Sequence, residues 1–239
     1  MKIFRLPLLV AAVMAITWTA TQPAWAEPVA NGLSYRAVPS MIAGTSPDGL
    51  GTWTVHYQRI DGGDPKLAAA LSDGIDAEAM RQVQQQTWDG STRRTWTFDT
   101  TGTAYFRPIT ISELYVGEYN TDEPNMPVRT VTSVVFDSRS GVLITWDNLF
   151  RDKRAGLARL SELSAAILPA VHPPPHPGSW RNSGQLAPLD TNFKYWIPTA
   201  EGIEMHFPDY QFGRGLKVIT LPWSGLSDLI APEFAPIMG

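Results

Sequence analysis

The chain has 239 residues, with 19 basic and 23 acidic side chains and no cysteine. The lack of cysteine excludes a disulfide framework, a thiol nucleophile, zinc fingers and iron–sulfur ligation. A net charge of −4 without any basic run argues against nucleic-acid binding and against attraction to anionic membrane surfaces.

The N-terminus has the three parts of a secretory signal peptide. Lys2 and Arg5 make it positive, residues 8–16 carry no polar side chain, and small residues precede the expected cleavage point between Ala26 and Glu27. An uncleaved membrane anchor is the alternative, but the apolar run is shorter than the roughly 20 residues that span a bilayer. We therefore expect residues 1–26 to be removed. The product would be secreted, extracellular or cell-wall associated, without a membrane anchor.

Residues 27–128 are expected to form an N-terminal portion with a strand, a long helix and further strands. Residues 27–48 are rich in Pro, Gly and Ser, which predicts a flexible leader with one strand near 34–38. Residues 53–60 alternate between apolar and polar side chains, as in a half-buried strand.

The longest predicted helix covers residues 66–88. Asp64 can cap it, Pro65 suits its first position, and Asp89-Gly90 ends it. One face carries an apolar stripe at helical spacing, made of Leu67, Leu71, Ile75, Ala79 and Val83.

The strands that follow the helix are expected to pair mainly as hairpins. Residues 93–100 and 103–108 predict two strands joined at Thr101-Gly102, and residues 109–119 predict a third before an acidic loop at 118–127. In the C-terminal portion, 129–239, strands are predicted at 129–137, 142–145, 192–198, 202–208 and 216–221. The same portion is expected to contain a helical turn at 146–150, a second long helix at 152–168 and a last helical segment at 223–230. One side of that second helix is expected to carry Leu157, Leu160, Ser164 and Leu168. This order indicates an α+β fold with a largely antiparallel sheet and two main helices, packed as one body.

Catalytic motifs are not apparent in the sequence. A serine hydrolase would show Gly-x-Ser-x-Gly between a strand and a helix, and residues 44–49 miss that spacing by one. Ser224 lacks the leading glycine and is expected to cap the last helical segment. We therefore assign no catalytic residue. A serine within hydrogen-bond reach of one of the four histidines would favour a hydrolase.

No metal or cofactor site is expected. His172 and His176 are separated by three prolines, and a polyproline II segment would place their α-carbons about 12 Å apart, too far for one ion. Glu118, Asp122 and Glu123 cluster in the acidic loop and could bind a cation weakly, but they lack the oxygen spacing of a calcium loop.

The Pro-rich loop at 172–185 is the candidate partner-binding segment. It holds His172, His176, Trp180 and Arg181. An exposed Trp180 could anchor an unknown protein or a cell-wall glycan. The alternative is that Trp180 folds back to cover the second long helix.

A family resemblance covers residues 131–230. Its motifs are Val134-Val135-Phe136-Asp137 with Ser140-Gly141, Trp146-Asp147-Asn148-Leu149-Phe150, the hairpin from Phe193 to Phe207, and the closing Tyr210, Gly215, Val218, Pro222 and Leu226. These resemble the RsiV-like family, a domain of unknown function in the ectodomain of the anti-sigma factor RsiV and in secreted mycobacterial immunogenic antigens. Family members often carry a Gly-Gly-x-His-Pro segment before the strand that contains Val131. In this chain residues 117–120 and 124–127 occupy that place and do not match the segment.

The resemblance implies an α+β body that ends in a β-grasp-like unit, without established catalytic residues. The RsiV domain binds lysozyme, and an esterase activity has been attributed to some mycobacterial relatives. Residues and resemblance together predict an exported, non-enzymatic, monomeric binding protein of actinobacterial type, acting at or beyond the cell envelope on an unknown ligand. The alternatives are a weak carboxylesterase-like envelope hydrolase and a cell-wall glycan-binding module.

Overall fold

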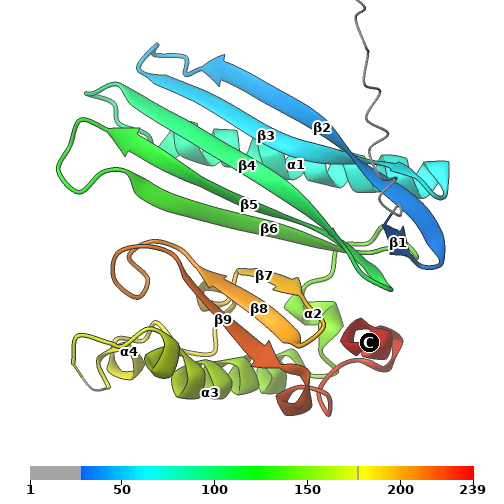
Figure 1. The fold of residues 1–239 in the computed structure, drawn as a ribbon. Coiled ribbons are helices and arrows are strands. Elements are labelled where there is room, and N and C mark those ends of the chain that lie inside the picture. The colour runs from blue at the N-terminus through cyan, green and yellow to red at the C-terminus, as the bar shows by residue number, and fades with distance from the viewer. Residues whose placement is uncertain (1–27, 177) are drawn as a thin grey trace, which may run out of the picture.

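The computed structural model describes residues 28–176 and 178–239 (Figure 1). Ala26 and Glu27, at the expected cleavage point, lie outside the described residues. Within the described ranges, no helix is both long enough and apolar enough to cross a membrane.

The larger of two sheets has six strands in the order of the chain. They are β1 (Val29–Ala30), β2 (Leu33–Thr45), β3 (Gly51–Gly62), β4 (Trp96–Phe106), β5 (Thr110–Thr121) and β6 (Val128–Asp137). All neighbours are antiparallel except β3 and β4. The division expected between residues 128 and 129 therefore falls at the start of a strand of this sheet.

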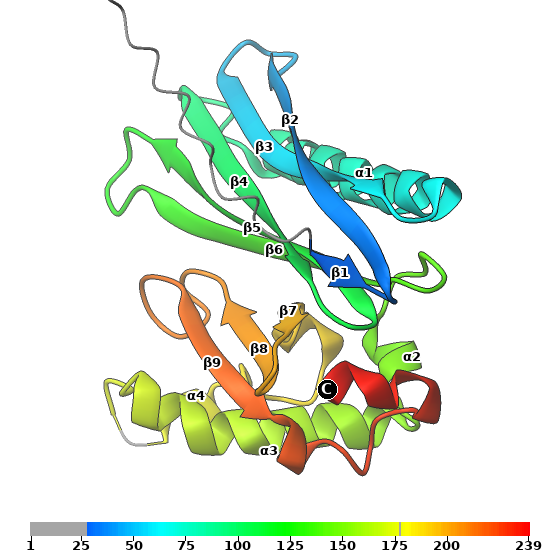
Figure 2. The ribbon, with the colours of Figure 1, turned by 45° about the vertical axis from the view of Figure 1, so that its right-hand side comes forward.

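Helix α1 (Pro65–Asp89) connects the two parallel strands and covers one face of the large sheet (Figures 1 and 2). Leu71, Ile75, Ala79 and Val83 of the predicted stripe are buried against aromatic and aliphatic side chains of the sheet, and Leu67 is partly buried there. The helix was expected from its periodicity. Strands β3 and β4 depart from the expected antiparallel pairing. A crossover helix as long as α1 allows them to pair in parallel.

Asp64 caps α1 as predicted. Its Oδ1 accepts hydrogen bonds from the backbone N–H groups of Lys66 (2.8 Å) and Leu67 (3.0 Å).

We expect Asp64→Ala to lower the free energy of unfolding by about 1 kcal/mol, because two N–H groups lose their acceptor. Urea unfolding measures this loss. Asp64→Asn keeps an acceptor and is the matched control, so equal losses in both variants would contradict a capping role.

The smaller sheet is antiparallel and consists of β7 (Tyr195–Pro198), β8 (Gly202–Phe207) and β9 (Lys217–Pro222). It lies between the large sheet and helix α3 (Lys153–Val171), as Figure 1 shows. Leu114 and Val131 of the large sheet meet Ile197 of β7, and this contact joins the two sheets. The predicted α+β class is confirmed, with a mostly antiparallel main sheet and a small C-terminal sheet.

The remaining helical segments are short. They are α2 (Trp146–Leu149), α4 (Ser179–Asn182) and 3₁₀ turns at Asp190–Asn192, Trp223–Gly225 and Pro232–Met238. A hydrophobic core beside the small sheet gathers side chains from that sheet, α2, α3, α4 and the 3₁₀ turns at Trp223–Gly225 and Pro232–Met238. Leu157, Leu160, Ser164 and Leu168, predicted on one side of α3, are buried.

Four predictions about local structure were wrong. The expected leader contains β2, which pairs with β3 from Tyr35 to Thr45. Thr101-Gly102 is no turn, because β4 pairs with β5 along its whole length. Residues 142–145 contribute only one bridge, from Leu143 to Phe136. The last helical segment is a short 3₁₀ turn whose cap position is Pro222 rather than Ser224.

Candidate functional site

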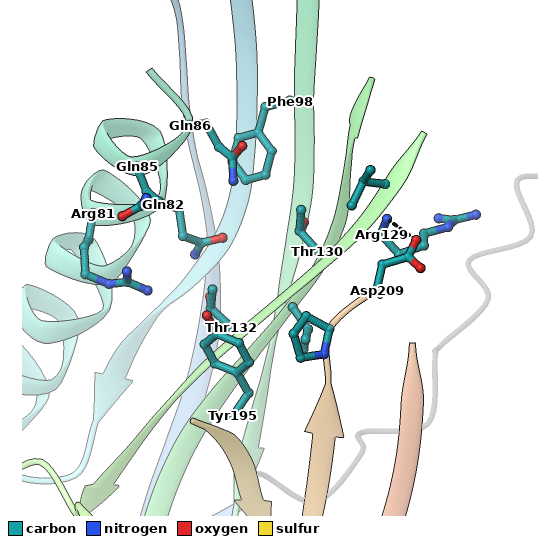
Figure 3. Close-up of a pocket in the computed structure, with 13 residues that line it drawn as sticks. Arg81, Gln82, Gln85, Gln86, Phe98, Arg129, Thr130, Thr132, Tyr195 and Asp209 are labelled. Carbon is teal, nitrogen blue, oxygen red and sulfur yellow. Dashed lines mark hydrogen bonds between the residues drawn. The ribbon is translucent and has the colours of Figure 1, made fainter. Parts of the chain in front are cut away.

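A cleft opens between the second half of α1 and strand β6. Its lining includes Arg81, Gln82, Phe98, Thr130, Thr132 and Tyr195, which come from α1, β4, β6 and β7 (Figure 3). The loop after β8, at Pro208 and Asp209, closes one end. We call this hollow the α1–β6 cleft, and its volume is about 180 Å³.

Three buried polar atoms on the walls of the cleft have no hydrogen-bond partner. They are Nε2 of Gln82 and the hydroxyl oxygens of Thr130 and Thr132. The Gln82 side chain comes from the buried face of α1, is 4% exposed, and reaches toward β6 (Figure 3). Buried polar groups in folded proteins nearly always have partners. The walls of the cleft therefore hold an amide donor and two hydroxyls that the protein itself leaves unpaired.

The charged side chains that line the cleft are already paired. Arg81 donates from Nε and Nη2 to the two carboxylate oxygens of Glu78, at 2.7 and 2.6 Å. This contact raises the pKa of the Arg81 guanidinium. Arg129 pairs with Glu118 at 3.2 Å, and Asp209 accepts the backbone N–H of Arg129 at 3.0 Å. The cleft is polar, but it presents little net charge.

Tyr195 contributes an aromatic wall and a phenol. Burial raises the pKa of this phenol, so it stays protonated at neutral pH and can donate a hydrogen bond. The Arg81 and Tyr195 side chains also line a second hollow of about 530 Å³, which extends past Trp146, Asp147 and Lys194. The two hollows adjoin at Arg81 and Tyr195, so a ligand longer than the cleft would have room to continue.

The Pro-rich loop does not present Trp180 to solvent. Trp180 is 7% exposed and packs its ring edge-on against Phe212, with 5.3 Å between ring centroids. Helix α4 turns the loop back and inserts the indole into the C-terminal core. Of the two alternatives for Trp180, the exposed one is contradicted and the folded-back one describes its position.

The other residues of that loop do not converge on one point. His172 makes a 3.2 Å contact from Nε2 to the carbonyl oxygen of Val218, whereas His176 and Arg181 are exposed. The part of the chain that the structure describes contains no group of three or more His, Asp or Glu side chains placed to hold a metal ion.

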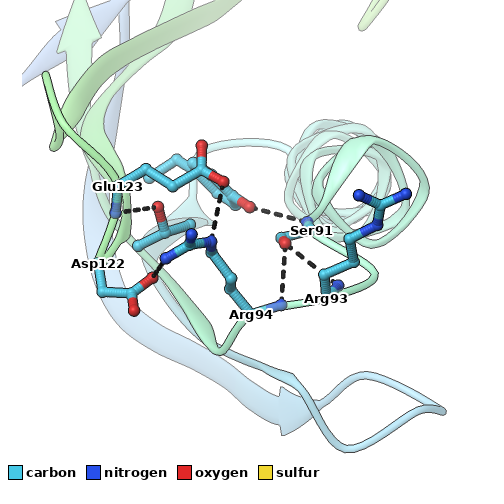
Figure 4. Close-up of polar contacts among 7 residues, drawn as sticks. Ser91, Arg93, Arg94, Asp122 and Glu123 are labelled. Atoms are coloured by element: carbon cyan, nitrogen blue, oxygen red, sulfur yellow. Dashed lines mark hydrogen bonds and ion pairs between the residues drawn. The ribbon is translucent and has the colours of Figure 1, made fainter.

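The acidic loop is neutralised by arginine. Arg94 pairs with Asp122 at 2.8 Å and with Glu123 at 3.2 Å, and its backbone N–H is held by the hydroxyl of Ser91 (Figure 4). The third carboxylate, Glu118, pairs with Arg129. Each of these three carboxylates is therefore paired with a guanidinium group.

The histidines give no sign of a serine hydrolase. His206 is buried and its Nε2 contacts Oε1 of Glu204 at 2.8 Å, which lowers the pKa of that carboxyl. Across residues 28–176 and 178–239, no hydrogen bond joins a serine hydroxyl to a histidine ring. The arrangement sought for the hydrolase alternative is not found in this part of the chain.

The residues of the α1–β6 cleft were not predicted from the sequence. Gln82 lies seven residues after Ile75 and three after Ala79, so it continues the buried face of α1. A polar residue at such a position was the available signal. Thr130 and Thr132 lie two residues apart, which places them on one face of a strand. Only the fold shows that this face meets α1.

Comparisons with known proteins identify the fold. No protein-family model matches the chain, and no curated protein matches it. A DUF3298 family protein from Pseudomonas aeruginosa PAO1 has a similar crystal structure, with a TM-score of 0.53 and 10% identity over 84% of this chain and 95% of that one. A DUF3298 family member from Bacteroides fragilis NCTC 9343 gives a TM-score of 0.53 and 9% identity over 86% and 96%. The chain therefore shares the fold of proteins from this family.

Proposed function

We propose that this protein is an exported, non-enzymatic binding protein related to the RsiV-like family, and that its ligand enters the α1–β6 cleft. The observation that carries this proposal is the buried Nε2 of Gln82, which lacks a hydrogen-bond partner and lines the same cleft as two hydroxyls in the same condition. Leaving such groups unpaired costs stability, so a ligand that pairs with them explains why they are there.

Two further observations support the proposal. The features of a signal peptide at Lys2, Arg5 and residues 8–16 favour export. The motifs that resemble the RsiV-like family fall, in the order of the chain, in β6, α2, β7, β8 and β9 and in the turns beside them. The shared fold with DUF3298 proteins, whose function is unknown, agrees with this relation.

Capture with the purified protein tests the proposal. The immobilised protein is incubated with isolated wall material and with exported proteins, beside the variants Gln82→Leu and Thr132→Val. We expect the wild type to retain a component at least tenfold better than either variant. Thr100→Val is the matched control, because it removes another buried, unpartnered hydroxyl that does not line the cleft.

Equal retention by the wild type and both cleft variants would overturn the proposed role of the cleft. Turnover of short-chain acyl esters that a single Ser→Ala change abolishes would instead favour the hydrolase alternative.

A further inference from the structure

We infer that the α1–β6 cleft binds the ring of a neutral sugar. The inference rests on the proposed function and specifies the chemical class of its ligand. Its starting point is the set of unpaired buried groups on the walls, namely Nε2 of Gln82 and the hydroxyls of Thr130 and Thr132, together with the phenol of Tyr195 in the same lining.

These groups match a polyhydroxylated ligand. A hydroxyl can both donate and accept, whereas the Gln82 Nε2 can only donate. A ring that carries several hydroxyls can therefore pair with the amide and with both threonines at once. A purely apolar ligand would leave all three unpaired, at a cost of about 1–3 kcal/mol for each group.

The charges of the cleft favour a neutral ligand. The Arg81 guanidinium is held by both oxygens of Glu78, and Arg129 pairs with Glu118. An anionic ligand would have to break one of these pairs, and a cationic ligand would have to compete for a carboxylate with an arginine or, at Asp209, with the backbone N–H groups that it accepts. Either exchange leaves a charge without its partner and weakens binding.

The shape of the cleft suits one ring and an extension. Its volume of about 180 Å³ is below the roughly 300–1,000 Å³ of pockets that take drug-sized molecules. Phe98 and Tyr195 supply aromatic walls, as is usual where a polar ring needs an apolar surface. The adjoining hollow beyond Tyr195 leaves space for the next residue of a glycan chain.

Nuclear magnetic resonance titration of the purified protein tests the inference directly. The probes are glucose, N-acetylglucosamine and arabinose, with glucose 6-phosphate and glucosamine as charged comparisons. We expect at least one neutral sugar to shift the Gln82 side-chain amide and the Thr130 and Thr132 methyl signals in a saturable way. Glucose 6-phosphate and glucosamine should both bind at least tenfold more weakly than that neutral sugar.

Matched variants separate binding from folding. Gln82→Leu and Thr132→Val should abolish the saturable shifts of the remaining cleft signals. Both should keep or raise the midpoint of thermal unfolding, because each removes a buried polar atom without a partner. Thr100→Val should leave sugar binding unchanged.

The two proposals fail in different ways. If none of the three neutral sugars gives a saturable shift, the inference about sugars is overturned. In that case the proposed function still stands, provided that Gln82→Leu and Thr132→Val lose the component captured from wall material or exported proteins. If no neutral sugar gives a saturable shift and both variants still capture the component as well as the wild type does, both proposals are overturned.

Discussion

Glu113→Gln is expected to remove a large pH dependence of stability between about pH 4.5 and pH 8. Glu113 lies on β5, is 0% exposed, and has one carboxyl oxygen without a hydrogen-bond partner. Burial raises the pKa of this carboxyl from 4.5 to about 8, and the nearby charge of Asp76 adds to the shift. The folded protein therefore holds a proton on Glu113 at pH values where the unfolded chain has released it.

Glu113 lies beside the place where β3 and β4 stop pairing with each other. Strands β3 and β4 pair only as far as His56 and Thr101. Beyond that point the Glu113 Oε1 accepts the backbone N–H of Gln58 at 2.8 Å. Gly102 makes room, since a Cβ at this position would lie 2.1 Å from Oε1. The carboxyl thus replaces the missing strand partner of an N–H group.

The sign of the effect follows from proton binding. Between pH 4.5 and about 8 the folded state binds more protons than the unfolded state, so the free energy of unfolding falls as pH rises. At roughly 1.4 kcal/mol for each pH unit, the whole window corresponds to at most about 5 kcal/mol. The stability that Glu113 contributes is complete below the unfolded pKa and lost above the folded pKa.

Urea unfolding of the wild type and the Glu113→Gln variant from pH 4 to pH 9 measures this window. We expect similar stabilities near pH 4.5, because the glutamine carbonyl can still accept from Gln58. At pH 9 the variant should be more stable by several kcal/mol. Parallel curves for the two proteins would show that Glu113 titrates at its ordinary value.

Glu113→Leu separates ionisation from hydrogen bonding. This variant should share the flat pH profile of Glu113→Gln in the same window. It should be less stable than Glu113→Gln by about 1–3 kcal/mol at every pH, because the N–H of Gln58 loses its acceptor.

Local patterns in the sequence were sufficient for several elements. The apolar stripe and cap of α1, the set of residues on one side of α3 and the alternation in β3 were predicted because each depends on neighbours within a few residues. The length of β2 and the continuity of β4 were not predicted, since both depend on pairing with distant strands. Pro39 and Gly102 resemble breakers in isolation, yet each lies within a strand.

The candidate site was harder to predict than the fold. Gln82, Thr130 and Tyr195 are far apart in the sequence, and only the packing of α1 and β7 about β6 brings them together. For Trp180 the sequence left two alternatives open, an exposed indole and an indole folded back onto the second long helix. Proline-rich composition indicated a loop correctly, but composition cannot show that α4 returns the indole to the core.

Trp180→Ala is expected to destabilise the protein by about 3–5 kcal/mol, the usual cost of removing a buried tryptophan. Its ring contacts Phe212, which in turn packs edge-on against Phe207 of β8 at 4.9 Å between centroids. The cavity left by alanine would open this aromatic cluster beside α3. Thermal or urea unfolding should show the loss, and retention on wall material should fall only as far as the folded fraction falls.

Trp88→Ala is the matched control for Trp180→Ala. Trp88 lies near the end of α1 and is 87% exposed, so the same substitution should change the free energy of unfolding by no more than about 0.5 kcal/mol. The pair also separates a structural tryptophan from a surface that binds. If Trp180→Ala keeps full stability but loses retention on wall material, Trp180 contacts a ligand in spite of its burial. If Trp88→Ala alone loses that retention, the exposed end of α1, rather than the α1–β6 cleft, holds the wall component.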